Sequence, residues 1–194
     1  MFLESFFISK VRIKILKLYF LKLGEEYHVR GVVRAIDEEI NAVRRELKNL
    51  EKAGLLESRK EGNKIVFSLV KTYPLYSELL NLIHKEFGLG GHFLLHRNEI
   101  GDIKFAMISR SFTKGIKIEP QDIDLMVVGK AEMQVLAGAI KDAERDLDRE
   151  IHYTVMTEDE FEYRKNKRDT FILNIIAGSK VMLVGDEDEM LSSV

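Results

Sequence analysis

Two carboxylates stand two residues apart at the start of an apolar run in the second half of the chain. Asp122 and Asp124 adjoin the apolar residues 125–128, and the pattern predicts a strand over 123–128. Because side chains alternate along a strand, both carboxylates would point to the same face. Such a pair can hold a divalent cation, Mg²⁺, against the phosphates of a nucleotide. Asp122 and Asp124 are therefore candidate metal ligands and candidate catalytic residues.

A polar segment ahead of this strand carries groups that suit phosphate binding. The segment, residues 109–115, contains hydroxyls, two cationic side chains and a closing glycine. Hydroxyl and backbone N–H donors can face phosphates in such a turn, and Lys and Arg add positive charge. The sequence predicts that nucleotide binding involves Arg110, Ser111, Lys114 and Gly115.

Residues 107–129 resemble the signature of the minimal nucleotidyltransferases, relatives of DNA polymerase beta and of the antibiotic nucleotidyltransferases. In that family a Gly-Ser pair and a glycine-closed turn precede Asp-x-Asp on a strand that ends in glycine. Ser111, Gly115, the pair Asp122 and Asp124, and Gly129 match these positions. The resemblance implies an α/β mixed-sheet domain that transfers a nucleotidyl group from a nucleoside triphosphate (NTP) with Mg²⁺.

Two positions depart from the family's pattern. Arg110 stands where the family has glycine, so it either crowds the approach of the triphosphate or binds a phosphate through its guanidinium. Active members carry a third carboxylate on a later strand as general base, and His152 occupies that position here. His152 is open to a role as base, metal ligand or structural residue. Glu150, on the same face of the predicted strand 151–156, is the alternative carboxylate. Both departures argue against a competent transferase.

The first 72 residues carry a different pattern. Apolar spacing predicts helices over 9–23, 28–36 and 40–53, and two extended runs around a Gly-containing turn predict a β-hairpin over 55–70. Three helices closed by a hairpin form a winged helix-turn-helix. This region resembles the one found ahead of nucleotidyltransferase domains in prokaryotic, often archaeal, regulators.

The third predicted helix has one apolar and one polar face. Val43, Leu47 and Leu50 share the apolar face, which we expect to pack against the first two helices. Arg and Asn side chains can pair with base edges in the major groove, and basic residues on a hairpin can contact phosphates. The residues predicted to bind double-stranded DNA are Asn41, Arg44, Arg45, Lys48, Lys52, Arg59, Lys60 and Lys64. The acidic turn 37–39 opposes this prediction because it would lie near DNA phosphates.

Charge and composition support a division into two modules. Residues 1–72 carry 15 Lys and Arg against 10 Asp and Glu, whereas residues 73–194 carry 15 against 22. We expect an α+β protein with a DNA-binding domain over 1–72, a connecting helix and linker over 73–90 with its joint at 88–91, and a nucleotidyltransferase-like domain over 91–194. The chain has no Cys, which excludes disulfide scaffolds and thiolate metal sites. No apolar run is long enough for a membrane helix, so we expect a cytoplasmic protein without a membrane partner.

These observations leave three functions open. The first is a DNA-binding transcription regulator, expected as a homodimer because such proteins commonly bind two half-sites. Its inactive second domain would bind NTP, mediate pairing or serve only as a scaffold. The second is a Mg²⁺-dependent nucleotidyltransferase acting on a protein, an RNA or a small acceptor. The third is a protein-association module without either activity.

Overall fold

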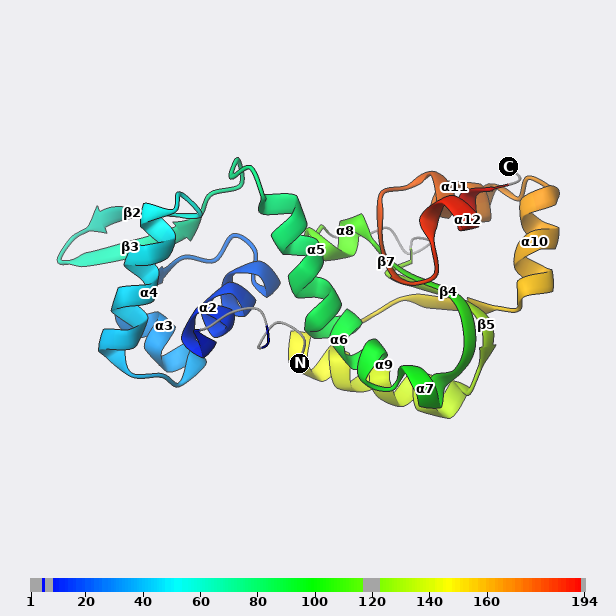
Figure 1. Cartoon of the computed structure of the whole chain (residues 1–194), viewed down its shortest axis with the longest axis horizontal. Helices are drawn as coiled ribbons and strands as arrows, with labels where there is room; N and C mark the ends of the chain where they lie inside the picture. Colours follow the sequence, from blue (N-terminus) through cyan, green and yellow to red (C-terminus); the bar gives the residue numbers. More distant parts are fainter. Residues whose placement is uncertain (1–4, 6–8, 117–122, 193–194) are drawn as a thin grey trace. The chain divides into compact units, whose positions relative to one another are not determined.

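The computed structural model describes residues 5, 9–116 and 123–192 of the chain (Figure 1). The chain forms two compact units, Met1–Glu86 and Phe87–Val194. The boundary between them falls within the segment 73–90 that the sequence predicts as the connection. Each unit has its own β-sheet, so the protein is a mixed α+β molecule.

The first unit has a winged-helix arrangement. Its three-stranded antiparallel sheet has the order β1-β3-β2. The hairpin of β2 and β3 turns at Gly62, whose φ of 58° favours glycine. In chain order the elements are α2 (Lys10–Leu21), β1 (Tyr27–His28), α3 (Val29–Ile36), α4 (Ile40–Lys52), β2 (Leu56–Glu61), β3 (Lys64–Leu69) and α5 (Tyr76–Glu86).

The apolar face of α4 anchors this unit as the sequence predicts. Val43, Leu47 and Leu50 are buried. Glu46 is also buried on this helix, where its Oε2 accepts a hydrogen bond of 2.9 Å from Nε of Arg12 on α2. Burial raises the pKa of Glu46, but hydrogen bonds led by that from Arg12 outweigh it, so the pKa lies below its ordinary value. The apolar packing and this ion pair fix which face of α4 remains exposed.

The second unit is built around a mixed four-stranded sheet. The strand order is β6-β5-β4-β7; β4 is antiparallel to β5 and to β7, while β5 and β6 are parallel. In chain order the elements are α6 (Gly88–Leu95), α7 (Arg97–Ile100), β4 (Gly101–Ser109), α8 (Arg110–Thr113), β5 (Leu125–Ala131), α9 (Met133–Leu147), β6 (Tyr153–Met156), α10 (Glu158–Asn166), α11 (Thr170–Ala177), β7 (Lys180–Val184) and α12 (Glu187–Leu191).

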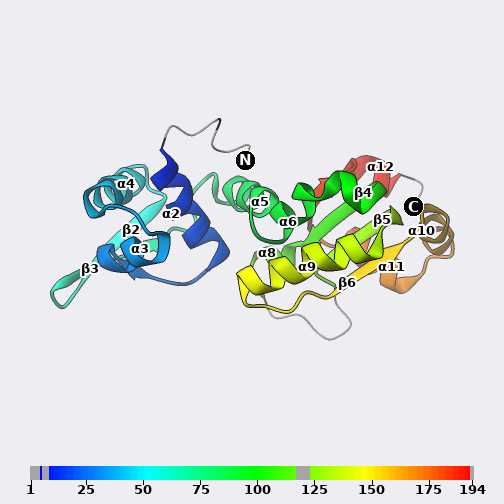
Figure 2. The same cartoon turned by 90° about the horizontal axis from the view of Figure 1, so that it is seen from below.

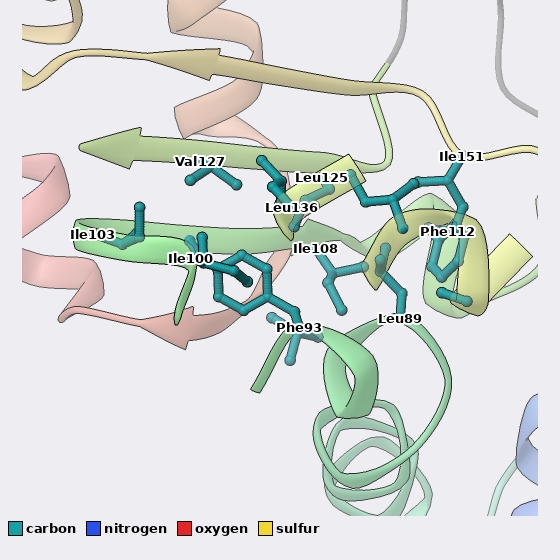
Figure 3. Close-up of a cluster of buried hydrophobic side chains, with 14 residues drawn as sticks. Leu89, Phe93, Ile100, Ile103, Ile108, Phe112, Leu125, Val127, Leu136 and Ile151 are labelled. Carbon is teal, nitrogen blue, oxygen red and sulfur yellow. The ribbon is translucent and has the colours of Figure 1, made fainter. Parts of the chain in front are cut away.

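Helices cover both faces of this sheet. One hydrophobic cluster joins α6, α8 and α9 to the strands, and Figure 3 shows Leu89 and Phe93 of α6 among side chains of β4 and β5. A second cluster joins the strands to α10, α11 and α12, and it contains Phe105, Met107 and Phe161. Figure 2 shows α9 running alongside the sheet. Because both faces are buried, β4 and β5 carry unbroken apolar runs at residues 105–108 and 125–128.

Three predicted features of the second unit differ from the structure. Gly88–Gly91 is the first turn of α6 rather than an interdomain joint, and Leu89 in this turn belongs to the hydrophobic cluster of Figure 3. The predicted strands 123–128 and 151–156 begin later, at Leu125 and Tyr153. Asp124 and His152 therefore precede strands, and strand alternation does not determine where their side chains point.

Among the described residues, no helix is both long and apolar enough to cross a membrane.

Candidate functional site

The eight predicted DNA-binding side chains are all exposed. Asn41, Arg45, Lys48 and Lys52 recur at intervals of three or four residues on α4, so they form one face of the helix. Among the residues that the structure describes, no carboxylate oxygen lies within 4.0 Å of the charged nitrogens of Arg44, Arg45, Lys48 or Lys52. Their charges are therefore available to a polyanion.

The hairpin supplies the remaining three candidates, which differ in their surroundings. Lys60 and Lys64 are exposed near the turn of the hairpin. Arg59 forms ion pairs with Glu26 and, at 3.4 Å, with Glu61. Arg59 must exchange those carboxylates for a phosphate before it can contact DNA, and Lys60 and Lys64 have no such pair in the described part of the chain.

Two of the three acidic residues before α4 have intramolecular partners. Glu38 accepts a 2.6 Å hydrogen bond from Nζ of Lys14 on α2. Glu39 caps α4: its carboxylate accepts from the backbone N–H groups of Asn41 and Ala42, each at 2.8 Å. These backbone hydrogen bonds, that of Asn41 first, hold the pKa of Glu39 below its ordinary value. The third acid, Asp37, is exposed and has a backbone φ of 50°. Its negative charge is therefore the one in this turn that most directly opposes DNA phosphates.

The predicted nucleotide-binding turn borders a pocket in the second unit. The pocket has a volume of about 570 Å³ and lies beside the end of β4, within the size range of small-molecule sites. Arg110, Ser111 and Lys114 line it, whereas Gly115 does not. Gly115 instead has φ of 64° and closes the turn after α8 through its N–H, which donates to the carbonyl of Phe112 at 2.9 Å.

Sequence reasoning missed the opposite wall of this pocket. Thr170, Phe171, Asn174 and Ile175 of α11, with Gly178 and Ser179 after it, lie about 60 residues along the chain from the predicted turn. They meet it because Arg110 N–H donates to the carbonyl of Ser179 at 2.9 Å and β7 pairs with β4. No spacing within the sequence signals that pairing. The completed pocket combines cationic and hydroxyl groups with apolar and aromatic side chains.

Asp124 is held by groups of the protein itself. Its side chain is 1% exposed; Oδ1 accepts from Nη2 of Arg149 at 3.2 Å and Oδ2 from the backbone N–H of His152 at 3.0 Å. Arg149 also donates to the carbonyl of Phe112 at 3.3 Å and stacks over its ring, 4.3 Å from the centroid. Arg149 thus joins α8 to Asp124, and it is a structural residue that the sequence pattern did not single out.

The other predicted catalytic positions lie near this ion pair. The His152 ring is half-exposed, with Nδ1 3.9 Å from Oδ2 of Asp124 and Nε2 4.0 Å from Oε1 of Glu150. Glu150 is 82% exposed. Asp122 lies outside the described residues. The structure brings Asp124, His152 and Glu150 together, but by way of a loop rather than one strand face.

The described residues do not fit a carboxylate site for Mg²⁺. Mg²⁺ needs oxygen ligands with free lone pairs in a near-octahedral arrangement. Both oxygens of Asp124 already accept hydrogen bonds, one of them from a cation. Among the described residues there is also no group of three or more His, Asp and Glu side chains that could hold a metal ion.

No protein-family model and no curated protein matches this chain. Among solved structures, it is similar to reduced HlyU from Vibrio cholerae N16961, with 23% sequence identity and a TM-score of 0.33. The similarity covers 51% of this chain and 86% of HlyU. At so low a TM-score, the winged-helix arrangement of the first unit rests on its own element order and sheet: helix, short strand, two helices and a hairpin.

Proposed function

We propose that the protein is a transcription regulator that binds double-stranded DNA through α4 and the hairpin β2–β3. The observation that carries this proposal is the exposed face of Asn41, Arg45, Lys48 and Lys52, whose cations have no carboxylate within 4.0 Å among the described residues. A helix of this kind fits the major groove, where Arg pairs with guanine and Asn with adenine. Lys60 and Lys64 would contact phosphates on the flanking backbone.

The active regulator is proposed to be a homodimer that occupies two half-sites. Two α4 helices related by two-fold symmetry would read half-sites about 34–36 Å apart. Light scattering of the protein alone and bound to DNA gives the protein–DNA stoichiometry, and two chains per site is the expected result. One chain per site would contradict the dimer and leave the DNA contact unaffected.

Fluorescence anisotropy with labelled duplex from upstream of the protein's own coding sequence tests DNA binding. Affinity should fall by at least about 10-fold between 50 and 200 mM salt, because phosphate contacts release counterions. Replacing Lys48 by Ala should reduce the salt slope by about one. The matched control is Lys130→Ala, which removes an exposed lysine from β5 in the second unit. Absence of any salt-sensitive binding would overturn the proposal.

For the second unit we propose binding of a nucleotide in the pocket beside β4. Arg110 and Lys114 supply positive charge, the hydroxyls of Ser109, Ser111 and Ser179 supply donors, and Phe171 supplies an aromatic surface for a base. This combination supports a ligand with phosphates at one end and a ring at the other. Calorimetric titration with ATP and with adenosine tests it; ATP should bind at least 10-fold more tightly than adenosine. Equal binding, or none, would contradict it.

Transfer of a nucleotidyl group is the alternative function of this unit. It requires Mg²⁺ at Asp122 and Asp124, and the contacts of Asp124 with Arg149 and His152 oppose that role. Labelled ATP with Mg²⁺, incubated with protein, RNA and small-molecule extracts, tests it. Modification of an acceptor that Asp122→Ala abolishes would establish the transferase. Absence of both DNA and nucleotide binding would favour the protein-association role.

A further inference from the structure

We propose that the pocket beside β4 binds its phosphate-bearing ligand without a divalent cation, an inference that rests on the nucleotide binding proposed above. The ligand is a nucleotide in its metal-free form. Asp124 is the carboxylate that would otherwise hold the metal, and it is paired with the guanidinium of Arg149.

Groups of the protein already bind both oxygens of the Asp124 carboxylate. Its carboxylate is 1% exposed, and both oxygens accept hydrogen bonds, at 3.2 Å from Arg149 and at 3.0 Å from the His152 N–H. A metal there would have to displace Arg149, which is also held by the carbonyl and the ring of Phe112. Displacement would leave a guanidinium beside the incoming cation, and two like charges at that distance repel each other.

The helix α8 links this ion pair to the pocket. Arg110 and Ser111 of α8 line the pocket, while the next residue, Phe112, is buried and binds Arg149. Arg149 therefore holds α8 through Phe112, a residue outside the pocket lining. In a metal-dependent site the cation would organise the phosphate-binding turn, and here the side chain of Arg149 already performs that task.

The pocket itself has the charge that a metal-free phosphate requires. Arg110 and Lys114 are cationic, and no Asp or Glu is among its described lining residues. Free ATP carries more negative charge than its Mg²⁺ complex, so Lys and Arg attract it more strongly. Hydrogen bonds from charged donors to phosphate are about twice as strong as neutral ones. The site is therefore expected to prefer free ATP to MgATP or to bind both equally.

Calorimetric titration of the full chain with ATP, once in EDTA and once in excess MgCl₂, tests the proposal. The Kd in EDTA should be equal to or lower than the Kd in MgCl₂, within about two-fold if equal. A Kd at least 10-fold higher in EDTA would overturn the metal-free inference and leave nucleotide binding intact. No binding in either buffer would overturn both.

Two further measurements test the metal-free site: a substitution in the pocket and an NMR titration of the unaltered protein. Lys114→Ala should weaken ATP binding in EDTA at least 10-fold, whereas the control Lys130→Ala, outside the pocket lining, should leave it unchanged. In the unaltered protein, Mn²⁺ alone should not selectively broaden the backbone amide NMR signals of Asp124, Arg149 and His152. Selective broadening of these signals at micromolar Mn²⁺ would show a metal at Asp124 and contradict the proposal.

Discussion

On α4 of the first unit, Arg45 and Lys48 are exposed and have no carboxylate within 4.0 Å among the described residues. In the second unit, Arg149 contacts Asp124 and Phe112, and the buried Lys165 donates to the carbonyls of Met190 and Ser192 at 3.2 and 2.9 Å. The same residue types thus lie exposed without an ion pair in the described part of one unit and hold the protein together in the other. A basic residue indicates a binding site only once its intramolecular partners are known.

The largest expected effect is the loss of stability when a buried ion pair, rather than an exposed one, loses its arginine. Arg149→Met should destabilise the second unit by about 3 kcal/mol, because it leaves the buried Asp124 without its cation. Urea unfolding followed by circular dichroism measures the change. The matched control is Arg145→Met, which removes a 72% exposed arginine paired with Asp142 and should change stability by no more than about 0.5 kcal/mol. An equal loss of stability in the two variants would show that Arg149 contributes no more to the fold than an exposed arginine.

The next largest effect is a difference in DNA affinity between two substitutions among the predicted DNA contacts of the first unit. Arg45→Ala should lower DNA affinity about 10-fold, or about 1.4 kcal/mol, because a base or phosphate contact is lost. Arg59→Ala should lower it less, about two- to three-fold, since Arg59 must first leave Glu26 and Glu61. Anisotropy titrations at one fixed salt concentration compare the two. A greater loss for Arg59→Ala would mean that the ion pairs do not restrain it.

A pH dependence follows from Glu46. Its folded pKa is below the ordinary value, so ionised Glu46 stabilises the fold above that ordinary pKa, and this contribution is lost as pH falls through the lowered value. Glu46→Gln should therefore be less stable than the unaltered chain at pH 7, with the gap narrowing on acidification below about pH 4.5. Urea unfolding at a series of pH values checks this. A gap that stays constant with pH would show that Glu46 acts through packing alone.

The smallest effect concerns the acidic turn before α4. Asp37→Asn removes a negative charge near the proposed DNA face, and Asn tolerates the left-handed backbone at φ of 50°. DNA affinity should rise about two-fold, with stability within about 0.5 kcal/mol of the original. Anisotropy and urea unfolding measure the two quantities. A fall in affinity would indicate that Asp37 lies away from the DNA or orders the turn.

Local pattern predicted most of the elements because their apolar periodicity is strong. The faces of α4 are an example: Val43, Leu47 and Leu50 are buried, and Arg45 and Lys48 are exposed. At Gly88–Gly91 the three glycines around Leu89 predict a joint, whereas the structure begins α6 there. Glycine has low helix propensity, and close packing on the hydrophobic cluster overrides it.

The sequence by itself determined the division into a basic and an acidic half, the helices and hairpin of the first unit, and the polar face of α4. These features depend on residues close together in the chain. Only the tertiary structure decided that α11 completes the pocket and that Arg149 neutralises Asp124, 25 residues away. The packing of strands and helices decides which cation lies beside a buried carboxylate. Residue type and spacing do not give the distance between two such side chains in the folded protein.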